Sequence, residues 1–238
     1  MSSHIVKAYD EEFDALDRIA AQMGGLAEKL LAEAFEALER RDPRLAEAAV
    51  AGDSAIDQLE RELQERVIAM IARRQPLAND LRHIMTVLKI AGDLERVGDL
   101  AKNIAKRALA VSNDSPPKPL MHGLRHMTEL ALRQLKNVLD AYSARDAEKA
   151  LAVWHSDADL DALYNSVFRE MLTYMMEDPR NIGMCTHLLF GAKNIERIGD
   201  HTTNIAENIY YLVTGATLPH ERPKGDDTSS MPITRPAG

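Results

Sequence analysis

Apolar residues recur at intervals of three and four along most of this chain, which is the spacing that lines one face of an α-helix. Two of the clearest stripes are Ile56, Leu59, Leu63 and Val67, and Leu81, Ile84, Met85 and Leu88. Aromatic residues make up only 5% of the sequence, in which Ala, Leu, Glu and Arg are abundant. Because these residue types favour long packed helices over strands, the pattern predicts an all-α fold.

Helix-breaking residues divide this pattern into segments. The breaks are at Asp42-Pro43, Gln75-Pro76, residues 113–119, Arg145-Asp146 and Asp178-Pro179. An Asp directly before a Pro can cap a helix whose first residue is that Pro, so helices are expected to begin at Pro43 and Pro179. The chain is therefore predicted to contain six long helical segments.

The two halves of the chain resemble each other. A shift of 104 positions places Met23 on Met127 and Leu31 on Leu135. Further along the chain the shift becomes 101, and residues 95–105 (ERVGDLAKNIA) then match residues 196–206 (ERIGDHTTNIA) at seven of eleven positions. This match indicates the duplication of a three-helix unit.

A polar, Pro-rich stretch at residues 112–119 separates the two copies. We therefore expect two tandem three-helix bundles, one over residues 1–114 and one over residues 115–214, packed end to end or side by side. From residue 215 onward, four prolines among small polar residues predict a disordered tail over residues 215–238.

Each copy of the matched motif carries two acids at positions i and i+4, followed one turn later by an amide. These residues are Glu95, Asp99 and Asn103 in the first copy and Glu196, Asp200 and Asn204 in the second. Continuing the apolar stripe along each helix places them on the line that faces the core. Like charges at this spacing repel each other, more strongly when partly desolvated, so a compensating partner is expected.

A second acidic pair precedes each motif. The pairs are Asp53 with Asp57 and Asp157 with Asp161. If the helices that carry them pack as neighbours, four carboxylates and an amide converge in each copy, a set of oxygen ligands that suits a hard cation. Gly98 and Gly199 would allow the helices to approach closely. The hypothesis is that each bundle holds at least one divalent or ferric ion, with Fe, Zn, Mg and Mn as candidates.

The same residues also permit a structural interpretation. Acidic pairs at i and i+4 are common on solvated helix faces, and Asn103 and Asn204 are equally consistent with amides bonded to a neighbouring helix. Within its own helix Asp99 can pair with Lys102, an option that the second copy lacks because Thr203 stands there. At this stage both interpretations remain open.

Other features exclude several classes of protein. The net charge of -8 and a pI near 5.5 argue against a nucleic-acid binder. The single Cys185 excludes an intramolecular disulfide and a Cys-based zinc site. His201 is matched by Leu100, so it is at most an accessory ligand. No nucleophile and base arrangement or phosphate-binding Gly-rich loop is recognisable, so no catalytic residue is assigned.

The first seven residues, MSSHIVK, do not form the apolar stretch of a signal peptide, and no apolar run approaches the 18 or so residues that span a bilayer. We therefore expect a cytoplasmic protein that reaches the membrane only peripherally, through its partners.

The duplicated ERxGDxxxNIA motif, the segment RRQPLAND at residues 73–80 and the segment MGGLA at residues 23–27 resemble the phosphate-uptake regulator family, PhoU. The resemblance spans roughly residues 4–214. It implies two three-helix bundles, a frequent homodimer and a cytoplasmic negative regulator of phosphate uptake and the phosphate-starvation response. Its implied partners are the ATPase subunit of the phosphate ABC transporter and a phosphate-sensing histidine kinase.

Some members of that family bind metal clusters through E/D-x-x-x-D motifs. In this chain the motif matches Glu95 to Asp99 and Glu196 to Asp200. The resemblance also extends, less directly, to the partner acids Asp53, Asp57, Asp157 and Asp161.

The expected function is thus a non-enzymatic adaptor whose acidic patches bind metal or contact partners. One rival is a ferritin-like carboxylate-bridged di-metal enzyme, which needs Glu-x-x-His pairs. Gly98 and Gly199 stand at the position of that histidine, which argues against this rival. The other rival is a purely structural helical scaffold, which predicts neither a metal nor a phosphate phenotype.

Overall fold

The structure, a computed structural model, describes residues 2–218, with side chains described from residue 11 onward. This range contains eight α-helices, one 3-10 helix and no strand. The first copy consists of α1 (Ser2–Arg40), α2 (Pro43–Gly52), α3 (Ser54–Arg74) and α4 (Asn79–Ala110). The second consists of α5 (Lys118–Ala144), α6 (Ala147–His155), α7 (Asp157–Glu177), η1 (Pro179–Asn181) and α8 (Ile182–Thr214).

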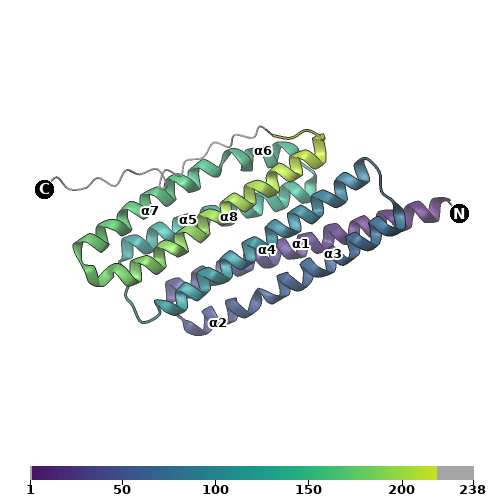
Figure 1. The fold of residues 1–238 in the computed structure, drawn as a ribbon. Coiled ribbons are helices and arrows are strands. Elements are labelled where there is room, and N and C mark those ends of the chain that lie inside the picture. Colours follow the sequence, from purple (N-terminus) through teal and green to yellow (C-terminus); the bar gives the residue numbers. More distant parts are fainter. Residues whose placement is uncertain (1, 219–238) are drawn as a thin grey trace.

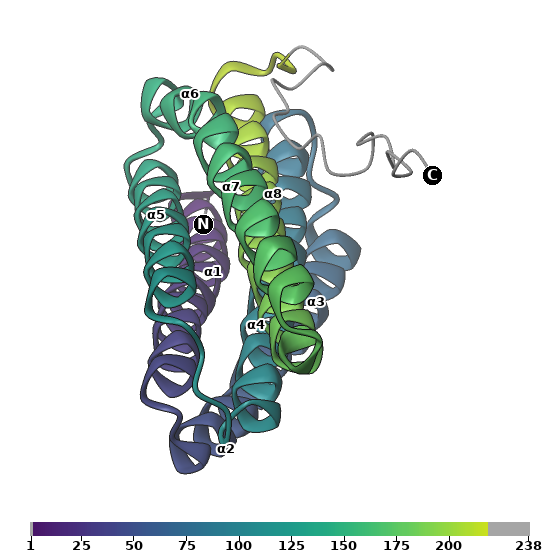
Figure 2. The ribbon, with the colours of Figure 1, turned by 90° about the vertical axis from the view of Figure 1, so that its left-hand side faces the viewer.

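Helices α2 and α3 follow one another along one layer, as do α6 and α7, so each copy is a three-helix bundle (Figure 1). The two bundles lie side by side: α4 packs against α8, which runs in the opposite direction, and α1 packs against α5 (Figures 1 and 2). The predicted all-α fold of two tandem three-helix bundles is confirmed, and the side-by-side arrangement is the one that the chain adopts.

The middle segment of each bundle is broken, which the sequence pattern does not predict. The breaks are single residues, Asp53 between α2 and α3 and Ser156 between α6 and α7. At Asp53 the turn tightens, because the Ile56 amide donates to the Asp53 carbonyl at 2.9 Å. Both breaks adjoin a buried aspartate, Asp53 or Asp157, whose side chain bonds the next long helix of its bundle. Each break in the middle segment therefore coincides with a side-chain bond between helices.

The helix starts follow the predicted capping in part. The Asp42 carboxylate accepts hydrogen bonds from the Arg44 amide at 2.9 Å and the Leu45 amide at 3.4 Å, and Pro43 begins α2 as expected. Pro179 instead begins the short helix η1, and α8 starts three residues later. The predicted helix start at Pro179, capped by Asp178, is therefore present, but it opens a 3-10 turn and the long helix α8 follows it.

The apolar stripes form the core, with one correction. Ile56, Leu63 and Val67 on α3 are buried as predicted, and so is Ile84 on α4. Leu81 and Met85 are 39% and 41% exposed, so the buried line of α4 is rotated away from the predicted one. It runs through residues that pack against α1, α3 and α8, namely Ile84, Val87, Ile90, Leu94, Val97, Ala101 and Ile104. The acids of the first motif consequently lie beside this line.

The connection between the bundles, residues 111–117, passes the end of the molecule where α2 lies (Figure 2). Arg41, at the turn between α1 and α2, donates from Nη1 to the Asp114 carbonyl at 3.0 Å and to Ser115 Oγ at 3.1 Å. The predicted boundary at residue 114 falls in this connection. Of the predicted tail, residues 219–238 lie outside the described part of the chain.

No helix in the described range has a stretch both long and apolar enough to cross a membrane.

Candidate functional site

The acids identified in the sequence lie on two equivalent helix pairs, α3 with α4 and α7 with α8. Two glycines allow each pair to approach closely. A Cβ atom added at Gly98 would lie 2.8 Å from Ile56 Cδ1 and 3.1 Å from Asp53 Oδ1. A Cβ atom at Gly199 would lie 2.5 Å from Leu160 Cδ2. The role predicted for these glycines is confirmed, because any larger residue would push the acid-bearing helices apart.

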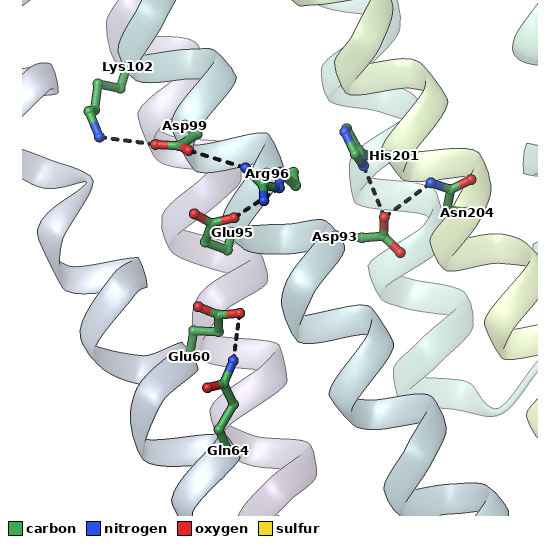
Figure 3. Close-up of polar contacts among 9 residues, drawn as sticks. All are labelled: Glu60, Gln64, Asp93, Glu95, Arg96, Asp99, Lys102, His201 and Asn204. Carbon is green, nitrogen blue, oxygen red and sulfur yellow. Dashed lines mark hydrogen bonds and ion pairs between the residues drawn. The ribbon is translucent and has the colours of Figure 1, made fainter.

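In the first bundle, cationic side chains from α4 itself occupy the acidic face (Figure 3). The Lys102 ammonium lies 2.5 Å from Asp53 Oδ2 and 3.0 Å from Asp99 Oδ1. Arg96 lies 3.5 Å from Glu95 and 3.8 Å from Asp99. Asp53 is buried at 2% exposure, so Lys102 supplies the charge that its carboxylate needs away from water.

The environment of the first cluster shifts the pKa values of Lys102 and Glu95. The hydrogen bond to Asp53 and, to a lesser degree, the bond to Asp99 raise the pKa of Lys102, which outweighs the opposite effect of its partial burial. Burial and the nearby charge of Asp99 raise the pKa of Glu95. Asp57 and Asn103 are half-buried on α3 and α4. The first cluster is thus a bridge between two helices that contains its own cation.

The second bundle buries three of its four acids, whereas the first buries only Asp53. Asp157, Asp161 and Glu196 are 3%, 4% and 4% exposed, and Asp200 is half-buried. The Lys193 ammonium lies 2.9 Å from Glu196 Oε1, whereas Glu196 Oε2 is buried and accepts no hydrogen bond. At the position that matches Lys102, the neutral Thr203 hydroxyl lies 3.1 Å from Asp157 Oδ1.

Burial raises the pKa of Glu196 to about 7, although the hydrogen bond from Lys193 lowers it. The nearby negative charges of Asp200 and Asp161 add to the rise. A carboxyl group of this kind would be stabilised in its ionised form by an added cation.

The second bundle therefore offers carboxylate oxygens, which are the donors that suit a hard cation, and Glu196 Oε2 is buried without a hydrogen bond, as is Asp53 Oδ1 in the first bundle. As the side chains stand, no group of three or more His, Cys, Asp or Glu residues in the described range is close enough to hold a metal ion. Ligation by Asp157, Asp161, Glu196 and Asp200 would require some of these carboxylates to turn towards one point.

The second asparagine of the motif bonds a residue of the other bundle. Asn204 donates from Nδ2 to Asp93 Oδ1 at 3.1 Å, and His201 Nδ1 lies 2.9 Å from the same oxygen (Figure 3). Asp93 is on α4, so these contacts join the two bundles. The alternative that Asn204 bonds a neighbouring helix is the one that the structure shows.

Sequence reasoning missed a second polar cluster between the bundles. Asp17 on α1 accepts a hydrogen bond from Tyr142 on α5 and lies 2.9 Å from His83 Nε2 and 2.5 Å from Arg145 Nη2. The ring of Phe13 stacks on His83 with centroids 4.7 Å apart. The only signal in the sequence was the matched pair of breaks at Arg41 and Arg145, which did not reveal where either arginine points.

Comparison with known proteins decides the family. The sequence matches the PhoU domain twice, over residues 20–108 and 124–209. The chain belongs to the PhoU family. Its two matched regions fall in the two bundles, and the resemblance inferred from the duplicated motif is confirmed.

Relatives within the PhoU family cover nearly the whole chain. A "phosphate-specific transport system accessory protein PhoU homolog" of Rhizobium meliloti (strain 1021) is 56% identical, over 96% of this chain and 97% of the relative. A protein of the same name from Caulobacter vibrioides (strain NA1000 / CB15N) is 50% identical, over 95% of this chain and 98% of its own length.

Solved PhoU structures share the fold. PhoU from Pseudomonas aeruginosa superimposes with a TM-score of 0.84 at 38% identity, over 87% of this chain and all of that chain. The phosphate transport system regulatory protein PhoU from Streptococcus pneumoniae has a TM-score of 0.82 at 28% identity, over 89% of this chain and 99% of that chain.

Proposed function

We propose that this chain is a negative regulator of phosphate uptake and of the phosphate-starvation response. The observation that carries the proposal is its 56% identity, over almost its entire length, to a relative named as an accessory protein of the phosphate-specific transport system. In the proposed role, the chain is a cytoplasmic adaptor between the ATPase subunit of the phosphate ABC transporter and a phosphate-sensing histidine kinase. An adaptor acts by contact, so we propose no enzymatic activity.

Apolar side chains at two helix turns support a role in protein contacts. Ile68 and Leu77, near the turn between α3 and α4, are 67% and 79% exposed. Met176 and Ile182, near the turn between α7 and α8, are 78% and 48% exposed. These turns lie at opposite ends of the molecule (Figure 1). We propose that partners or a second copy in a homodimer cover these side chains.

We propose further that Asp157, Asp161, Glu196 and Asp200 bind a divalent or ferric cation. The buried Glu196 Oε2 without a hydrogen bond supports this site, and so does the raised pKa of Glu196. Elemental analysis of protein purified without chelator tests it, with Asp200→Asn as the comparison. The variant is expected to contain less metal than the wild type. Equal metal contents would contradict the proposed site.

Phosphate uptake tests the regulatory role. Deleting the gene and measuring uptake of labelled phosphate by cells grown in phosphate-rich medium should show faster uptake than in the parent strain, because the transporter would lose its negative regulator. Restoring the wild-type gene should return uptake to the parental rate. A deletion strain with unchanged uptake would overturn the proposal.

A further inference from the structure

A cavity of about 600 Å³ lies between the two bundles, at the end of the molecule where α4 begins and α8 ends (Figure 1). Three side chains that carry or can take up a positive charge line it, namely Arg82, His83 and Arg145, and each is half-buried. The acids of the lining, Asp14 and Asp80, are exposed. Positive charge therefore lies in the more deeply buried part of a cavity large enough for a small ligand.

Arg82 is held in this cavity without an acceptor for its hydrogen bonds. Its guanidinium lies over the ring of Tyr211, 5.3 Å from the ring centroid. Its Nε atom is buried without a hydrogen bond, and Nη1 and Nη2 lie beside Gly215, 2.8 Å and 3.2 Å from where a Cβ atom would stand. Within the described part of the chain, Arg82 makes no hydrogen bond and no ion pair. Its charge and its five N–H donors are thus left for a ligand.

Arg145, from the other bundle, uses only part of its guanidinium. Its Nη2 atom donates to Asp17 at 2.5 Å and lies 2.6 Å from His83 Nε2. Its Nη1 atom is buried and has no hydrogen bond. The ring of Tyr142, with its centroid 5.0 Å from the guanidinium carbon, helps to hold the side chain in place. Because Asp17 balances the charge of Arg145, the charge of Arg82 is the one that has no carboxylate partner among the described residues.

We propose that this cavity binds a tetrahedral oxyanion such as phosphate or sulfate, held mainly by Arg82 and also by Arg145. A guanidinium group bonds two oxygens of such an anion through parallel N–H groups. The two arginines come from different bundles, and an anion whose oxygens point in four directions can accept from both. The anion would supply the acceptors that the protein does not provide, and it would offset the unpaired charge. The site is separate from the acidic motifs and does not rest on the proposed metal site or regulatory role.

Isothermal titration calorimetry with inorganic phosphate tests the inference. The full-length protein, stripped of metal with a chelator that is then removed, is titrated in a chloride buffer of constant ionic strength. The wild type is expected to bind one phosphate per chain. Arg82→Gln is expected to weaken binding at least about tenfold, because it removes the unpaired charge and most of the donors. Arg61→Gln, an exposed arginine on α3 outside the cavity, is the control and should bind as the wild type does.

A second variant separates binding from a general loss of structure. Asp80→Asn removes an acid from the cavity lining and is expected to tighten phosphate binding by about twofold, which a merely structural role of Arg82 would not explain. Thermal unfolding without phosphate should show that Arg82→Gln remains folded, because Arg82 bonds no described residue. A wild type that binds no phosphate overturns the inference, and so does equal binding by the wild type and Arg82→Gln. Equal weakening in Arg82→Gln and Arg61→Gln would also overturn it, whereas the regulatory role is tested separately by the deletion strain.

Discussion

Among the four acids of the duplicated motif, Glu196 is the most buried. Its carboxyl group is 4% exposed, one of its oxygens has no hydrogen bond, and burial raises its pKa from 4.5 to about 7. In the metal-free protein, the folded state therefore holds this proton more tightly than the unfolded state. Stability falls as the pH rises from about 4.5 to about 7, because ionisation costs more in the folded state.

Replacing Glu196 with Gln should remove this pH dependence. In the presence of chelator, the variant is expected to match the wild type below about pH 4.5 and to exceed its free energy of unfolding by about 1 to 3 kcal/mol at about pH 8. Urea unfolding at a series of pH values measures the difference. Glu95→Gln is the matched comparison and should gain less, because the Glu95 side chain is 20% exposed and lies near Arg96. Parallel pH profiles for wild type and Glu196→Gln would contradict this account.

Some of the side-chain contacts could be predicted from the sequence, and others could not. The pair of Asp99 with Lys102 was predictable, because residues at i and i+3 are neighbours on a helix. The contact of Lys102 with Asp53 was not, because it depends on how closely α3 approaches α4. The contact of Lys193 with Glu196 was not predicted, although these residues are also neighbours at i and i+3 on their helix.

For the helices, the close approach at Gly98 should control stability. Gly98→Ala would place a methyl group 2.8 Å from Ile56 Cδ1, and Ile56 is fully buried and has little room to move. The variant is expected to lose about 1 to 3 kcal/mol in free energy of unfolding. Gly92→Ala on the same helix has no atom within 4 Å of the added Cβ and should gain up to about 1 kcal/mol from helix propensity. Denaturant unfolding of both variants tests this, and equal effects would contradict the proposed close packing.

The six helical segments were predictable because apolar spacing and breakers such as Asp42-Pro43 are local signals. The breaks at Asp53 and Ser156 were not, because they coincide with the buried aspartates Asp53 and Asp157, whose bonding partners lie on another helix. The rotation of the α4 core line had a similar cause. Residues such as Val97 and Ala101 pack between several helices at once, so the buried surface of α4 is broader than a single stripe.

For the whole molecule, the Asp17 cluster joins α1 and α4 to the end of α5. Burial acts to raise the pKa of Asp17, but hydrogen bonds from His83 and Tyr142 and the charge of Arg145 outweigh it and lower the pKa. The ionised carboxylate therefore stabilises the folded state above its ordinary pKa of 3.8. This contribution is lost as the pH falls through the lowered pKa.

Asp17→Asn should weaken the contact between the bundles. At neutral pH, the variant is expected to lose about 1 to 3 kcal/mol in free energy of unfolding. The expected loss is smaller than for a fully buried ion pair, because Asp17 and Arg145 are each about a third exposed to solvent. The difference from the wild type should shrink in strongly acidic solution. Calorimetry measures both effects, and Asp14→Asn, an exposed acid nearby on α1, should behave as the wild type does. A variant as stable as the wild type at neutral pH would contradict a stabilising role for this cluster.

The duplication and the two bundles could be predicted, because the matched motifs repeat at constant offsets in the sequence. Their side-by-side arrangement could not. It depends on contacts such as those of Asp93 with His201 and Asn204, which join residues more than 100 positions apart and follow no local period.

The central claim is that this PhoU-family chain keeps the phosphate-starvation response off when phosphate is plentiful. The most direct measurement is alkaline phosphatase activity in phosphate-rich medium, in the parent strain, in a strain with the gene deleted and in that strain with the wild-type gene restored. The account predicts high activity in the deletion strain and low activity in the other two. Low activity in the deletion strain, equal to that of the parent, would contradict it.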